Sequence, residues 1–68
     1  MALFRSQRSR DVDALAYEVP SCESPAAKDR LQRGQLAAAR RLGRYQDVVQ
    51  LRNEINERRR PFRRPEID

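Results

Sequence analysis

The fold of this 68-residue chain is decided by residues 24–60, which read SPAAKDRLQRGQLAAARRLGRYQDVVQLRNEINERRR. Ser24 can cap a helix, because its hydroxyl accepts a hydrogen bond from a free backbone N–H, and Pro25 suits the first helical position. The Ala, Leu and Gln residues that follow favour helix. Gly43 can take the left-handed conformation that closes a helix C-terminus. We therefore predict a first helix from Pro25 to about Leu42.

A second helix is predicted from about Gln46 to Arg60. Its apolar residues Val48, Leu51 and Ile55 recur at spacings of three and four, which places them on one helix face. The proline that follows disfavours helix in the residue before it, so the segment ends there. The expected fold is all-α, with a short helical hairpin that is broken at the glycine between the two segments.

One long helix over residues 24–60 is the competing interpretation. It is supported by a heptad pattern whose seam residues are Leu31, Gln35, Ala38, Leu42, Tyr45, Val49, Arg52 and Asn56. Half of these positions are Gln, Ala, Arg or Asn, which bury little apolar area. The single helix would also place the apolar residues of the second segment on a different face. The hairpin is preferred, and the single helix is kept as the alternative.

Residues 1–23 are interpreted as an N-terminal arm that is extended or partly helical. The first ten residues show no clear period and are expected to form a flexible arm with a small apolar anchor. For the rest of the arm two interpretations remain. Asp11 could cap a short helix, or the alternation of apolar and polar residues over 15–19 could form a strand.

Residues 61–68 are interpreted as an extended basic tail. Pro61 and Pro65 restrict the backbone, so the tail is expected to lie along a surface rather than to fold back. Arginine is concentrated where the second helix meets the tail, with Phe62 among the basic residues. The pattern is typical of arginine-rich binding tails, in which guanidinium groups contact phosphate or carboxylate. The candidate contacts there are Arg58, Arg59, Arg60, Arg63 and Arg64.

The first predicted helix carries a second group of arginines. At about 100° per residue these side chains fall within one arc of the helix, next to an arc of small and apolar residues. Such a stripe could follow a nucleic-acid backbone or meet an acidic partner. A high-GC coding sequence, which favours Arg over Lys codons, would give the same arginine content without a function. The candidate contacts of this stripe are Arg30, Arg33, Arg40, Arg41 and Arg44.

The composition indicates that the chain needs a partner. Hydrophobic residues make up 38% of the chain and charged residues 37%. A chain of this length buries only about 60% of the surface of its unfolded form, so its core is small. We expect it to pack on a larger protein or to form a homo-oligomer. The residues expected to pack on that partner are Leu31, Ala38, Leu42, Tyr45, Val48, Leu51, Ile55 and Phe62.

Several kinds of chemistry are not supported by the sequence. It has no His, one Cys and two Gly, so it offers no cysteine–histidine pair, no zinc spacing and no glycine-rich phosphate loop. We expect no catalytic residue, metal, cofactor or small-molecule substrate. No apolar run exceeds about four residues, which argues against a membrane-spanning segment. The expected location is the cytoplasm, or a particle assembled there.

Two functions follow from these observations. The first is a non-enzymatic structural, assembly or adaptor protein, which docks on a larger partner or associates with itself within a virion-like or ribonucleoprotein-like complex. The alternative is a nucleic-acid-binding protein that contacts DNA or RNA through its arginines without reading the base sequence. The two are compatible, and the first is preferred, because the small core and the Ala-rich face of the first helix favour packing on a partner.

Overall fold

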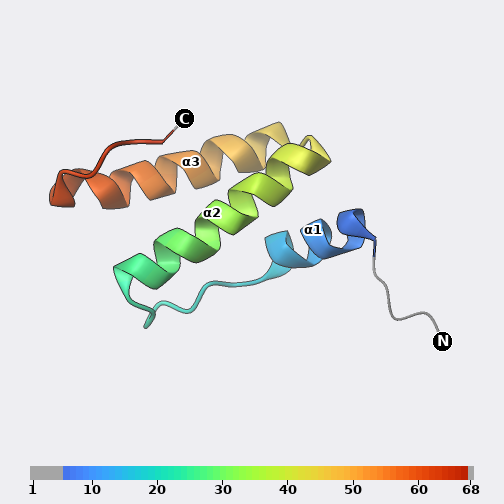
Figure 1. Ribbon diagram of the computed structural model, residues 1–68, viewed down its shortest axis with the longest axis horizontal. Helices are drawn as coiled ribbons and strands as arrows, with labels where there is room; N and C mark the ends of the chain where they lie inside the picture. The colour runs from blue at the N-terminus through green and yellow to red at the C-terminus, as the bar shows by residue number, and fades with distance from the viewer. Residues whose placement is uncertain (1–5, 68) are drawn as a thin grey trace.

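The computed structural model describes residues 6–67, and within that range all regular structure is helical (Figure 1). Helix α1 spans Gln7–Ala16, helix α2 spans Pro25–Leu42 and helix α3 spans Tyr45–Arg59. A single 3-10 turn, η1, covers Arg60–Phe62. The prediction of an all-α chain is therefore confirmed.

The three helices form a flat layer with α2 in the middle. Helices α1 and α3 each pack on α2, but they do not pack against each other. The molecule measures 48 × 26 × 15 Å along its principal axes. Figure 1 shows α3 and α1 on either side of the long central helix. We call this arrangement the open layer, because no further element within residues 6–67 closes the gap between α1 and α3.

Helix α2 begins and ends where local chemistry favours it. The Ser24 hydroxyl accepts a hydrogen bond of 3.2 Å from the Ala27 N–H, and Pro25 occupies the first helical position. At the other end, Gly43 has a φ of 73°, in the left-handed region. The chain leaves the helix there and starts α3 two residues later. One continuous helix over residues 24–60 is therefore not supported.

The N-terminal segment contains a helix, which was one of the two alternatives that the sequence left open. The Ser6 hydroxyl caps α1 by accepting a 3.1 Å hydrogen bond from the Ser9 N–H. Asp11 lies buried within the helix rather than at its cap, so the proposed cap at Asp11 was wrong. The strand over residues 15–19 was also wrong, since the chain is helical to Ala16 and irregular beyond it. The flexible arm was expected over residues 1–10, of which the first five lie outside the described residues.

The C-terminal tail does not stay extended as expected. After η1, Arg63 adopts a left-handed conformation with a φ of 55°, which reverses the chain. The tail then runs back beside α3 (Figure 1). The Asn56 side chain holds it there, accepting a 2.7 Å hydrogen bond from the Ile67 N–H and donating one of 2.9 Å to the Ile67 carbonyl. Proline restricts the tail, but it does not prevent this turn.

The core is small, and polar contacts complete it. Among the described residues, the buried apolar side chains are Leu36, Ala38, Ala39 and Ile55. Four polar residues are equally buried, and each one ties its own helix to a neighbouring segment: Asp11, Asp29, Gln35 and Asn56. Buried polar groups are tolerated where they are hydrogen-bonded. These contacts fix how α1, α3 and the tail lie on α2.

Candidate docking groove and arginine face

A groove of about 720 Å³ lies over α2, in the gap between α1 and α3. Its floor is formed by Gln32 and Gln35 of α2. One wall is the side of α1 that carries Val12, Leu15 and Ala16, continued by residues 17–19 of the connection to α2. The groove exists because α1 and α3 each contact α2 without reaching each other.

The opposite wall of the groove comes from α3. Leu51 is its apolar residue, and Gln50 and Arg44 also line it. The edge of the groove is acidic, because Asp47 and Glu54 line it from α3 and Glu18 lines it from the connection after α1. Three carboxylates therefore face one guanidinium in a chain whose net charge is +5.

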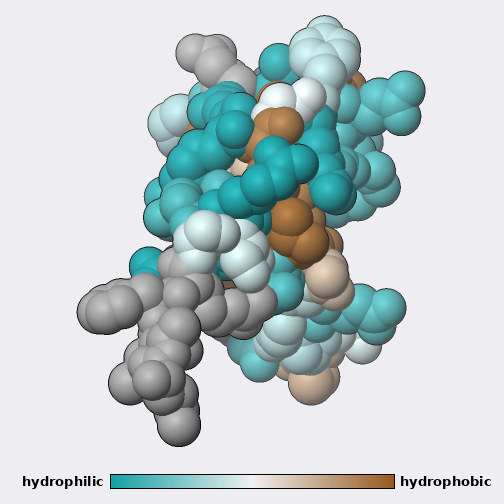
Figure 2. Space-filling view, turned by 90° about the vertical axis from the view of Figure 1, so that its right-hand side faces the viewer, coloured by the Kyte–Doolittle hydropathy of each residue, from teal (hydrophilic) through white to brown (hydrophobic). Residues whose placement is uncertain are grey.

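Apolar residues in the groove are only partly covered. Val12 keeps 37% of its surface exposed, and Leu15, Val19 and Leu51 are half-buried. On the side of the molecule that Figure 2 draws, which is the right-hand side of Figure 1, apolar surface is likewise confined to a narrow brown strip between broad hydrophilic regions. A partner helix that covers such a surface is stabilised by about 25 cal/mol of binding free energy for each Å² of apolar area removed from water.

An ion pair between Asp11 and Arg41 fixes α1 on α2, and so sets one side of the groove. The Arg41 Nε and Nη2 atoms donate to both carboxylate oxygens of Asp11 at 2.8–3.2 Å. Gln7, one turn earlier on α1, donates to the same carboxylate at 2.9 Å. The hydrogen bond from Arg41 lowers the pKa of Asp11, against the opposing effect of burial.

The α1–α2 contact also uses the carbonyl groups at the end of α1. The Gln35 side-chain amide donates to the Ala14 carbonyl at 3.0 Å and to the Tyr17 carbonyl at 2.8 Å. Carbonyl groups in the last turn of a helix have no partner within the helix. Gln35 therefore caps α1 and forms part of the groove floor at the same time.

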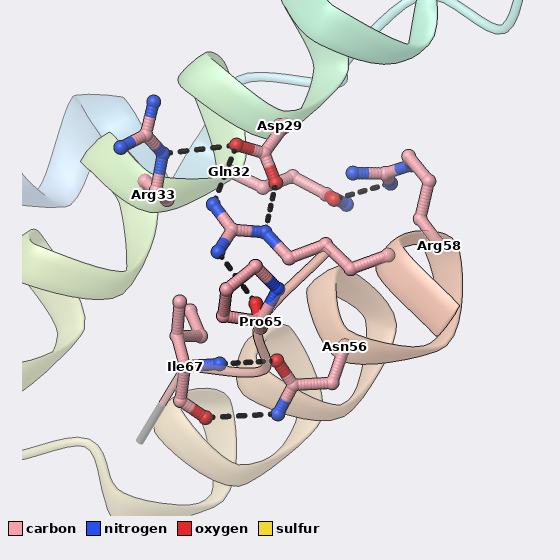
Figure 3. Close-up of polar contacts among 8 residues, drawn as sticks. Asp29, Gln32, Arg33, Asn56, Arg58, Pro65 and Ile67 are labelled. Atoms are coloured by element: carbon pink, nitrogen blue, oxygen red, sulfur yellow. Dashed lines mark hydrogen bonds and ion pairs between the residues drawn. The ribbon is translucent and has the colours of Figure 1, made fainter. Parts of the chain in front are cut away.

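A matching ion pair joins α2 to α3 (Figure 3). The Arg59 Nε and Nη2 atoms donate to the two carboxylate oxygens of Asp29 at 3.1 and 3.0 Å. Arg33, one turn later on α2, contacts the same carboxylate at 3.0 Å. The Arg59 hydrogen bond lowers the pKa of Asp29 in spite of burial, and the nearby charges of Arg59, Arg33 and Arg64 lower it further.

The arginines singled out in the sequence divide into two groups. Arg41 and Arg59 serve the fold through the ion pairs above, and Arg58 donates to the Gln32 side chain. One Nη atom of Arg58 is buried without a partner, so this side chain is also committed to the interior. The remaining candidates are exposed to solvent: Arg30, Arg33, Arg40, Arg44, Arg60, Arg63 and Arg64.

The exposed arginines lie mostly away from the groove, with Arg44 as the exception that lines it. Arg33 and Arg40 border a separate shallow depression of about 280 Å³, next to Ile67 of the returning tail. Arg60 lies 3.5 Å from Glu66 within the tail itself. Binding by these arginines stays a prediction.

The residues expected to pack on a partner are distributed between the interior and the surface. Ala38 and Ile55 lie in the core, whereas Leu42, Val48 and Leu51 are half-buried and Leu31, Tyr45 and Phe62 are exposed. The sequence reasoning missed the buried Leu36 and Ala39, although their spacing of three residues is a helical-face signal. The burial of Asp11 and Asp29 was also missed, and Gln35 and Asn56 had been placed only in the seam of the single-helix alternative.

No family model matches this chain, and neither a curated protein nor a solved structure matches it. Within residues 6–67, no helix is long and apolar enough to cross a membrane. The same residues contain no cluster of three His, Cys, Asp or Glu side chains that could hold a metal ion.

Proposed function

We propose that the protein is a non-enzymatic adaptor that docks on a larger protein by receiving an amphipathic helix of that partner in the groove. The observation that carries this proposal is the open layer, in which α1 and α3 flank α2 without touching. In this proposal residues 24–60 act as a helical hairpin that carries the groove, and α1 supplies its second wall.

A helix suits the groove because the groove already has helical walls. Packed helices lie about 8–10 Å apart, so a helix placed over α2 contacts both α1 and α3. Four-helix arrangements are a common closed form of such layers. The partly exposed Val12 and Leu51 then meet apolar residues spaced three and four apart on the incoming helix, as in other helix-in-groove complexes.

The acidic edge selects for a basic partner helix. Glu18, Asp47 and Glu54 surround the apolar strip, and opposite charges across an interface favour the correct partner. A second copy of this chain, placed groove to groove, would bring the same carboxylates together. Like charges placed opposite one another disfavour association. The proposal is therefore a heteromeric contact with a basic amphipathic helix.

The experiment uses two designed helical peptides of about 18 residues, which form about 27 Å of helix. Both carry the same leucine stripe, and their polar faces are lysine in one and glutamate in the other. They are titrated into the isotope-labelled full chain and followed by NMR chemical shifts. We expect the lysine peptide to perturb the groove residues at about tenfold lower concentration than the glutamate peptide.

Matched variants separate groove binding from general attraction. Glu18→Gln with Asp47→Asn should weaken the lysine peptide, whereas Glu23→Gln with Glu57→Gln makes the same charge change at exposed sites outside the groove. Val12→Gln should weaken both peptides, while Leu31→Gln, outside the groove, should not. Equal loss in test and control variants would refute the proposal. So would sedimentation of the isolated chain as a dimer whose groove residues are protected from exchange.

A further inference from the structure

Charge is separated between the two faces of the open layer, although it is mixed along the sequence. On α3, Asp47 and Glu54 line the groove. At about 100° per residue, Arg52 lies about 140° around the helix from Asp47 and about 160° from Glu54. On α2, Gln32 and Gln35 form the groove floor. The folded chain thus has an acidic groove and a basic opposite side.

The arginines of α2 lie on that opposite side. Arg30 and Arg41 are about 160° and 180° around the helix from Gln32, which lies in the groove floor. Arg33 and Arg40 border the depression next to the returning tail. The tail adds Arg64, which lies close enough to Asp29 of α2 to lower the pKa of that carboxyl group.

We propose that this surface binds the phosphate backbone of nucleic acid. We call it the arginine face and define it by Arg30, Arg33, Arg40, Arg41 and Arg64. Because the arginine face lies opposite the groove, this binding does not depend on the proposed docking of a partner helix. The protein would then join a protein partner on one face to nucleic acid on the other.

Two of these arginines are held in place and still have donors to offer. Arg33 contacts Asp29 through Nε, and 53% of its side chain is exposed. Arg41 contacts Asp11 through Nε and Nη2, and 51% of its side chain is exposed. A guanidinium group has five N–H donors, so both keep donors that can reach a phosphate. The ion pairs reduce the rotamer freedom that binding would otherwise remove.

The arginine face also has an excess of positive charge. Asp29 is shared between Arg33 and Arg59, with Arg64 nearby, so one carboxylate faces three guanidinium groups. Arg30 is exposed and extends the positive surface. A polyanion that neutralises such a surface releases its own counterions, which favours binding at low salt.

The dimensions fit a nucleic-acid strand. Arg30 and Arg41 are separated by about 16 Å along α2, at about 1.5 Å per residue. Phosphates advance by about 3.4 Å per nucleotide along one strand of a duplex, so the stripe spans about five nucleotides. Between the arginines stand Gly34 and Ala37, which carry too little apolar area to insert into a membrane. Phosphate contacts carry no sequence information, so binding is independent of base sequence.

The experiment measures fluorescence anisotropy of labelled duplex DNA, single-stranded DNA and RNA with the full chain at several salt concentrations. The test variant is Arg30→Gln with Arg64→Gln, both exposed. Its control is Arg8→Gln with Arg44→Gln, which makes the same charge change at exposed positions off the arginine face. Circular dichroism confirms that both variants keep their helices.

We expect the test variant to bind about tenfold more weakly. The slope of log binding constant against log salt concentration should become less steep by about two, one unit for each lost phosphate contact. The control should change affinity by less than about twofold. Equal losses in the two variants would overturn the proposal, because they would reflect net charge alone. Absence of binding at low salt would also overturn it. Flotation with phosphatidylserine vesicles, combined with no nucleic-acid binding, would assign the arginine face to a membrane surface instead.

Discussion

The contact of α1 with α2 and the contact of α2 with α3 each use an aspartate–arginine ion pair, but the two pairs have different surroundings. Asp11 pairs with Arg41 in the first, and Asp29 pairs with Arg59 in the second. In both, a buried aspartate meets an arginine 30 residues later, and a side chain one turn away supports it. The arginines differ, since the Arg41 side chain is 51% exposed and that of Arg59 only 11%.

This difference indicates that α1 is the more weakly attached helix. Water competes for an exposed guanidinium and screens its charge, so an exposed pair contributes little to stability. The pair between α2 and α3 is shielded, and the fully buried Ile55 of α3 adds apolar area at the same contact. Removing one partner of a shielded pair also leaves the other partner desolvated and unmatched.

The largest effect is expected from Asp29→Ala. The substitution leaves Arg59 without its carboxylate and should cost about 2 kcal/mol of unfolding free energy. In a domain of this size that corresponds to a fall in Tm of about 10 °C, measured by circular dichroism. Asp11→Ala serves as the reference. An equal or larger loss in the Asp11 variant would contradict the ranking of the two contacts.

Acid should weaken both contacts together. Hydrogen bonds from Arg41 and Arg59 lower the pKa of Asp11 and Asp29 from the ordinary value of 3.8. A lowered folded-state pKa means that the stabilisation is present above about pH 4 and is lost as the pH falls further. We expect Tm to drop by several degrees between about pH 5 and pH 2. The double variant Asp11→Asn with Asp29→Asn should lose this part of the pH dependence, and an unchanged acid profile would contradict the assignment.

A smaller and more local effect is expected from Asp11→Ala. Because Arg41 is half exposed, solvent can replace the carboxylate that it loses. Amide hydrogen exchange should speed up across α1 while α2 and α3 stay protected. Asp29→Ala should instead speed up amide hydrogen exchange in all three helices, because it disturbs the contact between α2 and α3. Uniform acceleration in both variants would show that the two contacts do not open separately.

The smallest effect is expected from Gly34→Ala, in the helix that both contacts share. A Cβ atom at Gly34 would meet nothing within 4 Å, and the backbone there is helical. Alanine should therefore raise stability by about 0.5–1 kcal/mol. Gly43→Ala should have the opposite effect and lower stability, because the left-handed φ of 73° disfavours alanine. A loss of stability in the Gly34 variant would indicate a close neighbour that the structure does not show.

The limits of α2 could be predicted from the sequence because they depend on local chemistry. Ser24, Pro25 and Gly43 act within one or two turns of their own positions. The packing of α1 could not be predicted in this way. It depends on Arg41 meeting a carboxylate 30 residues earlier, and no local pattern marks that pairing. The groove follows from that packing and was equally absent from the sequence interpretation.

The return of the tail has the same origin. Its proline residues are local signals, and they suggested an extended chain. The position of Ile67 is instead decided by Asn56, eleven residues earlier, which offers both a donor and an acceptor in the geometry of a backbone peptide. The charge separation that defines the arginine face could not be predicted for the same reason, because it arises only when the tail and α2 lie side by side.

The order of contacts in the open layer has a consequence for how the chain folds. Each helix packs only on the helix next to it in the sequence, through the short connections 17–24 and 43–44. Closing a short loop costs little chain entropy, and proteins built from near-neighbour contacts fold in microseconds to milliseconds. We expect the α2–α3 unit to form first, with α1 docking in a separate and faster reversible step. The groove would then form and open at the rate at which α1 docks on α2 and leaves it.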